Sequence, residues 1–433
     1  MNIYYLIYVI ISSLVLFFVP FILFCTWLTG RYHKLIIERF GYYSFKRSLP
    51  KKNRLWLHAV SVGEVKVAQS VIEKLFEIDS NLDIILSTTT PKGYDVAQTI
   101  NRSHLQCLYA PIDSLASVRL AFHHIKPDIL VLLETEIWPN WIYTANALNI
   151  PVVIVNGRIS KKTVSGYLKF SSLAHFIVKK IDAFSMISTQ DAHRICQIGA
   201  EPKKVHVSGN AKFDILQSTC SNPLLPVQLK KCLNIGPEDF VFIAGSTRSG
   251  EEKMVLSAFQ SLQKKYPNAI CMIAPRHVER CPSIESYMLQ CRLTYNRYSQ
   301  CKGIQNRDAQ IILVDTIGDL ANLYSIASVV FCGGSLVPQG GQNVLEPAVW
   351  AKPVIYGPYM DDFLWAKTIL EASSGGIEVK NEQELTEKVL MLASDKKQSI
   401  KFGQSARTSV LKESGASEKH VQIILKTMQQ YRK

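Results

Sequence analysis

Short apolar runs alternate with longer amphipathic stretches along most of this chain, and this alternation constrains the fold more than any other feature. Each run has the length of a buried strand, and stretches with helical periodicity separate most of them. Seven runs precede a polar stretch at 217–237, and they cover residues 54–60, 82–89, 107–113, 128–135, 151–158, 183–189 and 204–210. Five more follow it, at residues 240–246, 269–275, 310–316, 329–335 and 352–358. A parallel sheet covered by helices on both faces gives this pattern, so we predict an α/β chain with two Rossmann-like, doubly wound domains.

The length and composition agree with two domains. The chain has 433 residues, of which 47% are hydrophobic and 19% are charged, which suffices for two domains of about 150–200 residues each. We expect an N-terminal domain over residues 31–220 and a C-terminal domain over residues 221–433. The ten cysteines occur singly, without a C-x-x-C pair, which favours reduced thiols in a cytosolic compartment and argues against structural zinc.

The first thirty residues differ from the rest of the chain. No residue from Ile3 to Leu28 is charged. At about 1.5 Å per residue, a helix of this length exceeds the ~30 Å hydrocarbon thickness of a bilayer. A signal peptide would show a basic start, a shorter apolar core and a small-residue cleavage site, and none of these is obvious here. The sequence therefore predicts an uncleaved transmembrane anchor helix over residues 1–30.

A basic belt follows the predicted anchor. It consists of Arg31, Lys34, Arg39, Lys46, Arg47, Lys51, Lys52 and Arg54. Against Glu38 alone, eight positive charges minus one give +7 of the chain's +14, and the positive-inside rule places everything after the anchor in the cytoplasm. The belt could serve only as this topology signal, or it could also bind an acidic lipid. The other basic residues are diffuse, so we expect no nucleic-acid partner.

Polar loops follow most of the predicted strands. Their sequences are HAVSVGE, STTTPKGY, ETEIWPN, NGRIS, GNAKFD, AGSTRSGEE, APRHVER and GGSLVPQGGQNVLEP. In open α/β sheets, ligands bind outside the carboxyl ends of the strands. Eight such loops at strand ends predict a long cleft between the two domains.

The glycine-rich loop in the C-terminal half is a candidate phosphate site. It matches neither the Walker A pattern nor G-x-G-x-x-G. Its glycines permit positive φ, and amide groups at the start of the following helix suit an anion; a simple chain reversal remains the alternative. Glu346 in that helix could stabilise the helix dipole or bind a ribose. Arg276 and Arg248 could each bind a phosphate or form an interdomain salt bridge.

Taken together, the motifs SVGE, TTTPKGY, ETEIWPN, GNAKFD, AGSTRSGEE, APRHVER and GGSLVPQGGQNVLEPA resemble those of a known family. The chain is similar to the 3-deoxy-D-manno-octulosonic acid (Kdo) transferases of lipopolysaccharide inner-core synthesis. The resemblance implies a GT-B glycosyltransferase fold and an inverting, metal-independent enzyme without a cofactor. It also implies CMP-Kdo as donor, a lipid A precursor (lipid IVA) as acceptor, and single-pass attachment to the inner membrane with the catalytic domains on its cytoplasmic side. The N-terminal domain would bind the acceptor and the C-terminal domain CMP-Kdo.

The resemblance also assigns roles to particular residues. Glu64 matches the family's general base, Lys212 a residue that stabilises the transition state, and Glu134, favoured over Glu136, an acidic residue near the reaction centre. The expected CMP contacts are Pro275, Arg276, Gly318, Asp319, Leu320, Asn343, Val344, Leu345 and Glu346. Two departures concern donor contacts: Gln342 stands where the family has His, and GPYMDDF replaces GPHTFNF.

Glu64 also suits the chemistry on physical grounds. Transfer to a sugar hydroxyl requires a base for the hydroxyl proton, and a phosphate leaving group needs no general acid. Glu64 begins a predicted helix, where the dipole is expected to lower its pKa; a capping carboxylate without chemistry is the alternative reading. Asp361 and Asp362 lack further ligands, so we predict no metal. The rival functions are a UDP-sugar transferase or epimerase of the same fold, and a nucleotide-sugar binding protein that has lost catalysis.

Overall fold

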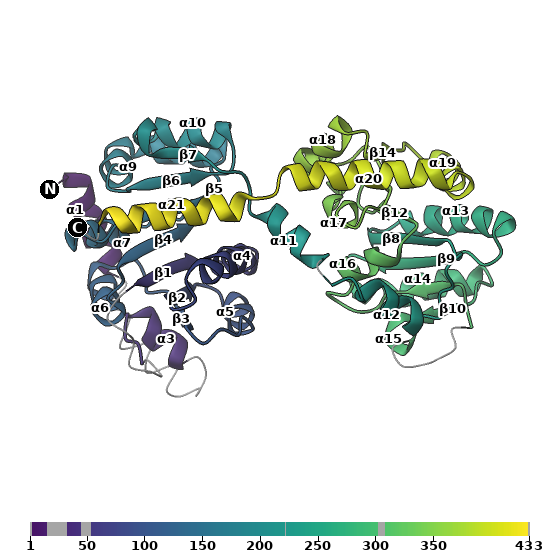
Figure 1. The fold of residues 1–433 in the computed structure, drawn as a ribbon, viewed down its shortest axis with the longest axis horizontal. Helices are drawn as coiled ribbons and strands as arrows, with labels where there is room; N and C mark the ends of the chain where they lie inside the picture. The colour runs from purple at the N-terminus through teal and green to yellow at the C-terminus, as the bar shows by residue number, and fades with distance from the viewer. Residues whose placement is uncertain (1, 15–32, 45–52, 221, 302–307, 432–433) are drawn as a thin grey trace. The chain divides into compact units, whose positions relative to one another are not determined.

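The computed structural model describes residues 2–14, 33–44, 53–220, 222–301 and 308–431 (Figure 1). The chain forms two compact units. The first contains Met1–Ile215 together with Ser414–Lys433, and the second contains Leu216–Glu413. Each unit is built around one seven-stranded sheet.

The sheet of the first unit is parallel, with strand order β3-β2-β1-β4-β5-β6-β7. Its strands are β1 Arg54–Ala59, β2 Asp83–Thr88, β3 Leu105–Tyr109, β4 Ile129–Leu133, β5 Val152–Gly157, β6 Ala183–Met186 and β7 Val205–Val207. The central strands are buried throughout, and separate hydrophobic clusters contain side chains of alternating residues such as Trp56 and Leu57. Burial on both faces explains why these strands appear in the sequence as continuous apolar runs.

Helices cover both faces of this sheet. They are α1 Ile3–Ser13, α3 His33–Arg39, α4 Val62–Ile78, α5 Pro91–Gln98, α6 Leu115–Ile125, α7 Pro139–Ala147, α8 Lys161–Lys169, α9 Ser171–Val178, α10 Thr189–Gln197 and α21 Ala416–Gln430, with a 3₁₀ turn at Pro202–Lys204. Several starts follow ordinary capping chemistry: the Thr90 side chain accepts from the Gly93 amide, and Pro91 occupies the first helical turn of α5.

The second unit repeats the architecture, with strand order β10-β11-β9-β8-β12-β13-β14 and parallel pairing. Its strands are β8 Val241–Thr247, β9 Ile270–Pro275, β10 Tyr295–Arg297, β11 Ile311–Leu313, β12 Val329–Cys332, β13 Val354–Tyr356 and β14 Gly376–Glu378. Its helices are α12 Leu225–Cys232, α13 Glu251–Lys265, α14 Cys281–Gln290, α15 Tyr298–Cys301, α16 Leu320–Leu323, α17 Leu345–Ala348, α18 Leu364–Ala372, α19 Glu382–Ser394 and α20 Lys396–Lys412, with 3₁₀ turns at Val278–Arg280, Tyr324–Ile326 and Asp361–Phe363. Helix α11, Lys212–Thr219, spans the boundary between the two units.

The last helix differs from the expected domain division. Residues 414–433 were expected to belong to the C-terminal domain, but α21 packs in the first unit against α4 and β5 (Figure 1). The Asp214 carboxylate accepts from the amides of Gly415 and Ser417 at 2.5 and 2.6 Å, and His420 is buried against Ser185. These polar contacts fix the first two turns of α21 to the first unit.

The prediction of an N-terminal transmembrane anchor helix is wrong. Among the described residues, no helix is both long enough and apolar enough to cross a membrane. The part of the predicted anchor that the structure describes forms the 11-residue helix α1, which spans about 16 Å at 1.5 Å per residue, well short of the ~30 Å hydrocarbon core. The rest of the predicted anchor, residues 15–30, lies outside the described residues.

Helix α1 is instead attached to the first unit through its tyrosines. The Tyr5 side chain is buried, its ring stacks on Tyr143 with 4.4 Å between centroids, and its hydroxyl donates to Asn140 Oδ1 at 3.0 Å. The Tyr8 hydroxyl donates to Asp113 Oδ2 at 2.6 Å. Two hydroxyls with partners inside the unit explain why this apolar stretch packs on the protein, a tertiary arrangement that hydropathy does not reveal.

The variant Tyr5→Ala is expected to lower the free energy of unfolding of the first unit by about 3 kcal/mol, because it removes a buried aromatic ring and leaves a cavity. Tyr4→Ala is the control, since Tyr4 is about half exposed and a surface change is worth about 0.5 kcal/mol or less. Denaturant unfolding followed by fluorescence of the buried Trp56 and Trp141 measures the difference. Equal stabilities of the two variants would contradict the docking of α1.

Three residues of the basic belt form hydrogen bonds or ion pairs within the first unit. Arg54 is buried, and its Nε pairs with Asp83 Oδ2 at 2.6 Å. Arg39 Nη1 donates to the Ala110 carbonyl, and burial lowers its pKa. Lys34 pairs with the buried Glu38 at 3.6 Å. The other five members of the belt, Arg31, Lys46, Arg47, Lys51 and Lys52, lie outside the described residues.

Candidate active site

The strand order of the first sheet reverses between β1 and β4, and this switch point is where ligands bind in doubly wound folds. The SVGE turn with Glu64 directly follows β1, and the ETEIWPN segment with Glu134 and Glu136 directly follows β4. The sheet topology therefore brings these two segments, about seventy residues apart in sequence, to one edge.

Glu64 lies in the first turn of α4 and its side chain is held firmly. Its Oε2 accepts from the Val60 amide at 2.8 Å and its Oε1 from the Ser61 hydroxyl at 2.9 Å, an arrangement related to a capping box. Burial raises the pKa of Glu64, and the negative charge of Glu134 raises it further, against the lowering effect of these hydrogen bonds. The expected lowering of this pKa is therefore not found, because desolvation outweighs the helix start.

Glu134 lies in a strained backbone conformation next to a cation. Its φ is 53°, in the left-handed region that non-glycine residues rarely adopt. Its amide donates to the Val155 carbonyl at 3.0 Å, and its Oε1 pairs with Lys212 Nζ at 3.2 Å. The loop thus holds the carboxylate beside the lysine of GNAKFD, which neutralises its charge.

Lys212 is positioned by an asparagine that sequence analysis did not single out. The Asn156 side chain, at the end of β5, accepts from the Ala211 amide at 2.9 Å, and Asn210 Oδ1 accepts from the Lys212 amide at 3.0 Å. Asn156 is buried and has a φ of 52°. The NGRIS motif after a strand was the sequence signal, and the structure shows that its first residue supports the lysine loop.

Glu136 is the other acidic candidate of the ETEIWPN segment, which the sequence analysis ranked below Glu134. Burial raises the pKa of Glu136 to about 7, and the charges of Glu64 and Glu134 add to the effect. Its Oε2 accepts from the Trp138 indole at 2.9 Å. A carboxyl group with a pKa near neutrality, beside two other carboxylates, is the pattern found where proton transfer takes place.

The raised pKa of Glu136 predicts a pH-dependent effect on stability. The folded state holds this proton up to about pH 7, whereas the unfolded state releases it near 4.5, so the stability present below pH 4.5 is lost as the pH rises to 7. The variant Glu136→Gln mimics the protonated form. We expect its melting temperature to exceed that of the wild type at pH 8 by more than at pH 5. The same difference at both pH values would show that Glu136 does not titrate in this range.

Beneath these carboxylates lie buried, uncharged side chains. Burial lowers the pKa of His58 to about 4, so its ring is neutral at pH 7; its Nδ1 lies 3.0 Å from Ser87 Oγ and its ring packs against Trp141. Both side chains are buried in the core. They support the loop after β1 rather than contact a ligand.

The second unit places all the predicted donor contacts at the carboxyl edge of its sheet. Pro275 ends β9 and is followed by the exposed Arg276; Gly318 to Leu320 follow β11, and Asn343 to Glu346 follow β12. Asn343 Nδ2 donates to Glu346 Oε1 at 3.3 Å. The side chains of Val344 and Leu345 are buried in the core, so only their backbone is suited to a ligand.

The glycine-rich loop after β12 is organised by a buried carboxylate, Glu251. This side chain accepts from the amides of Arg248, Gly334, Ser335 and Leu336 at 2.7–3.0 Å. Gly334 has a φ of 69°, which favours glycine. Because Glu251 already occupies the amides of residues 334–336, these amides are not available to a phosphate. The anion site expected at the start of the following helix stays a prediction.

Arginine side chains surround this edge with different partners. Arg280 forms two hydrogen bonds with the Glu252 carboxylate, at 2.7 and 3.0 Å, and is thus structural. Arg248 Nη1 donates to His277 Nε2 at 2.8 Å, while its Nε has no hydrogen-bond partner within the described parts of the chain. Within the same parts, no group of three or more His, Cys, Asp or Glu residues could hold a metal ion.

Comparison with known proteins identifies the family. A family model described as 3-Deoxy-D-manno-octulosonic-acid transferase (kdotransferase) matches residues 35–215. The 3-deoxy-D-manno-octulosonic acid transferase of Aquifex aeolicus is 30% identical over 84% of this chain and 94% of that protein. A bifunctional glycosyltransferase/methyltransferase of Fusobacterium nucleatum is 36% identical over 80% of this chain, which spans only 54% of that longer relative.

Solved structures support the fold. UDP-GlcNAc 2-epimerase from Neisseria meningitidis has a TM-score of 0.59 and 14% identity, covering 86% of this chain and all of that one; at this identity the likeness shows a GT-B-like fold alone. The relatives that carry the transferase name match most of both chains, and the motifs that surround Glu64, Glu134 and Lys212 lie inside the matched segment. The chain therefore belongs to the Kdo transferase family and is a glycosyltransferase.

Proposed function

We propose that this enzyme transfers Kdo from CMP-Kdo to a lipid A precursor, lipid IVA, with inversion at the anomeric carbon. The observation that carries the proposal is the cluster at the switch point of the first sheet. It contains three carboxylates: the charge of Glu134 raises the pKa of Glu64, the charges of Glu64 and Glu134 raise the pKa of Glu136, and Lys212 pairs with Glu134. Membership of the family supports Kdo as the transferred sugar, and the carboxylate cluster offers a general base for the reaction.

In the proposed reaction, an acceptor hydroxyl oxygen forms a bond to the anomeric carbon while the bond from that carbon to the CMP phosphate breaks. The hydroxyl proton goes to the Glu64 carboxylate, and CMP leaves with the bonding electron pair. A raised pKa makes Glu64, once ionised, a stronger base than an ordinary glutamate. Attack on the face opposite to the leaving CMP inverts the configuration, and no covalent enzyme intermediate forms.

The second unit is proposed to bind CMP-Kdo. Arg276 is exposed at the end of β9, and Arg248 keeps a buried Nε unpaired within the described residues. Both guanidinium groups suit the charge that builds on the leaving phosphate. We further propose that the acceptor, an amphiphilic lipid, is met at the cytoplasmic face of the inner membrane.

Nucleotide binding tests the donor. CMP is expected to bind the wild-type protein in titration calorimetry and to bind Arg276→Ala about ten- to a hundredfold more weakly, because a charge-assisted hydrogen bond to phosphate is lost. Arg292→Ala, on a surface loop of the same unit, serves as the matched control. Binding of UDP in preference to CMP would contradict the proposal and favour a UDP-sugar enzyme of the same fold.

A further inference from the structure

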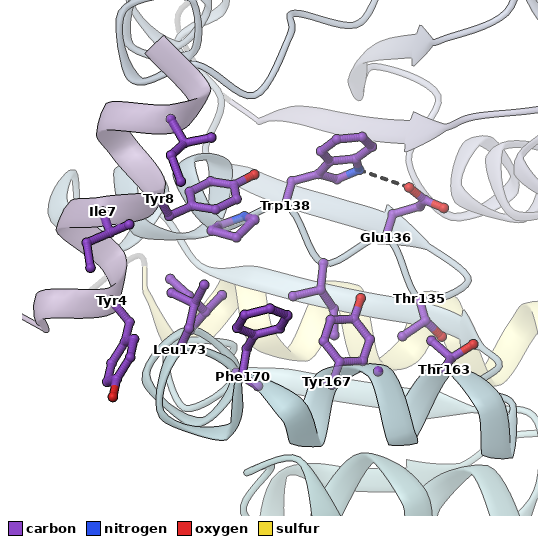
Figure 2. Close-up of a pocket in the computed structure, with 16 residues that line it drawn as sticks. Tyr4, Ile7, Tyr8, Thr135, Glu136, Trp138, Thr163, Tyr167, Phe170 and Leu173 are labelled. Atoms are coloured by element: carbon purple, nitrogen blue, oxygen red, sulfur yellow. Dashed lines mark hydrogen bonds between the residues drawn. The ribbon is translucent and has the colours of Figure 1, made fainter. Parts of the chain in front are cut away.

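An apolar groove of about 830 Å³ lies in the first unit, directly beside the proposed site (Figure 2). It is formed by α1, the segment after β4, α8 and α9. Its lining residues are Tyr4, Ile7, Tyr8, Ile11, Thr135, Glu136, Ile137, Trp138, Pro139, Thr163, Gly166, Tyr167, Phe170, Leu173, Ala174 and Ile177. Its volume falls in the range of small-molecule sites, about 300–1,000 Å³.

The two ends of the groove differ in chemistry. At one end lie Thr135, Glu136 and Thr163, and at the other lie the α1 side chains Tyr4, Ile7 and Tyr8 (Figure 2). Glu136 belongs to the loop that also carries Glu134, so the polar end of the groove is continuous with the proposed reaction centre.

Between these ends the groove offers few hydrogen-bonding groups, of which the Tyr167 hydroxyl is one (Figure 2). The Trp138 indole N–H is directed to Glu136, and the Tyr8 hydroxyl is directed to Asp113. An extended peptide laid in the groove would leave its backbone N–H and C=O groups without partners, at a cost in free energy. A hydrocarbon chain has no such groups.

The end away from the site opens through exposed apolar side chains. Tyr4, Ile7 and Ile11 of α1 are 52%, 47% and 60% exposed, and Phe170, which lies between the two ends of the groove (Figure 2), is 68% exposed. Exposed apolar groups that continue an apolar groove mark a binding surface. The occupant must therefore carry a polar head at Glu136 and a long apolar tail that leaves past α1.

We propose that this groove binds one fatty acyl chain of the acceptor glycolipid and so holds the sugar head at the carboxylate cluster. The inference rests on the proposed function for its acceptor, but it names a site outside the reacting groups. It assigns α1 a function: its Ile7 and Ile11 form a wall of the groove.

Gly166 gives a clean way to block the groove. It lies in α8, lines the groove, and an added Cβ would meet no atom within 4 Å. The variant Gly166→Phe places a ring in open space and also replaces a glycine inside a helix, which favours folding. Gly166→Ala controls for the loss of glycine. Lys162→Phe adds the same ring to an exposed position of α8 that does not line the groove.

The first measurement is binding of a dansyl-labelled C14 fatty acid to the full-length protein, followed by fluorescence. The wild type, Gly166→Ala and Lys162→Phe are expected to bind this probe alike, and Gly166→Phe at least about tenfold more weakly. Equal binding by Gly166→Phe would overturn the proposal. A shift between monomer and dimer in Gly166→Phe, seen by analytical ultracentrifugation, would instead assign the groove to a second copy and overturn it as well.

The second measurement compares transfer to a tetra-acylated acceptor with transfer to its fully deacylated disaccharide. The ratio of the two kcat/KM values is expected to fall about tenfold in Gly166→Phe relative to both controls. An unchanged ratio would count against an acyl chain in the groove. Failure of the wild type to use either acceptor would refute the proposed function, whereas the probe measurement would still decide whether the groove binds an acyl chain.

Discussion

Replacement of Glu64 by glutamine is expected to lower kcat for Kdo transfer by about 10²–10⁴-fold, because a positioned general base contributes about this much. The amide keeps the size of the side chain but cannot take the proton. The base must be ionised, so kcat of the wild type should fall when the pH drops below the pKa of Glu64. Because burial raises this pKa, the fall should occur at a higher pH than the pKa of an ordinary glutamate would give.

The matched control is Glu77→Gln on the same helix. Glu77 is exposed and pairs with Lys74 at the surface, and such a pair contributes about 0–1 kcal/mol. This variant should transfer Kdo at the wild-type rate. A Glu64→Gln enzyme with normal melting temperature and normal kcat would reduce Glu64 to a capping residue, the alternative left open from the sequence.

The second large effect is expected for Lys212→Met. Loss of the ammonium group removes the partner that lies 3.2 Å from Glu134. The negative charges of Glu64, Glu134 and Glu136 then lie near one another without this positive charge. We expect kcat to fall about 10²-fold, as for other groups that stabilise charge in a site. The acidic limb of the pH profile should also move to higher pH, because the uncompensated charge of Glu134 raises the pKa of Glu64 and of Glu136 further.

Two further variants separate charge from structure. Lys212→Arg keeps the positive charge and should retain part of the activity and the original acidic limb. Lys203→Met removes an exposed lysine, whose surface pair with Glu201 spans 3.1 Å, and should change neither quantity. An unshifted pH profile in Lys212→Met would show that the lysine does not act on the carboxylate cluster.

Most strands of both sheets could be predicted from the sequence, because strands of a parallel sheet that are buried on both faces consist of continuous apolar runs. The pattern of apolar runs missed β10 and β14, which are three-residue edge strands with mixed composition. It also extended the run at residues 107–113, whereas β3 ends at Tyr109. Short edge strands bury little surface and therefore leave a weak pattern.

The errors at the N-terminus and in the site share one cause. Hydropathy cannot show that Tyr5 and Tyr8 find hydrogen-bond partners inside the first unit. Position at a helix start indicated a low pKa for Glu64, but the degree of burial is decided by residues far away in sequence. Glu251 belonged to a noted motif, yet its partners, the amides of residues 334–336, are more than eighty positions away. Motifs locate a site; only the fold shows what each side chain contacts.

The most direct test of the account is the mass of the product formed from CMP-Kdo, generated in situ, and a tetra-acylated lipid A precursor. The wild-type enzyme should add whole Kdo units to the acceptor, which also counts the sugars transferred, and Glu64→Gln should add none in the same time. Absence of any Kdo adduct with folded, CMP-binding wild-type protein, or the same adduct at the same rate with Glu64→Gln, would contradict the account.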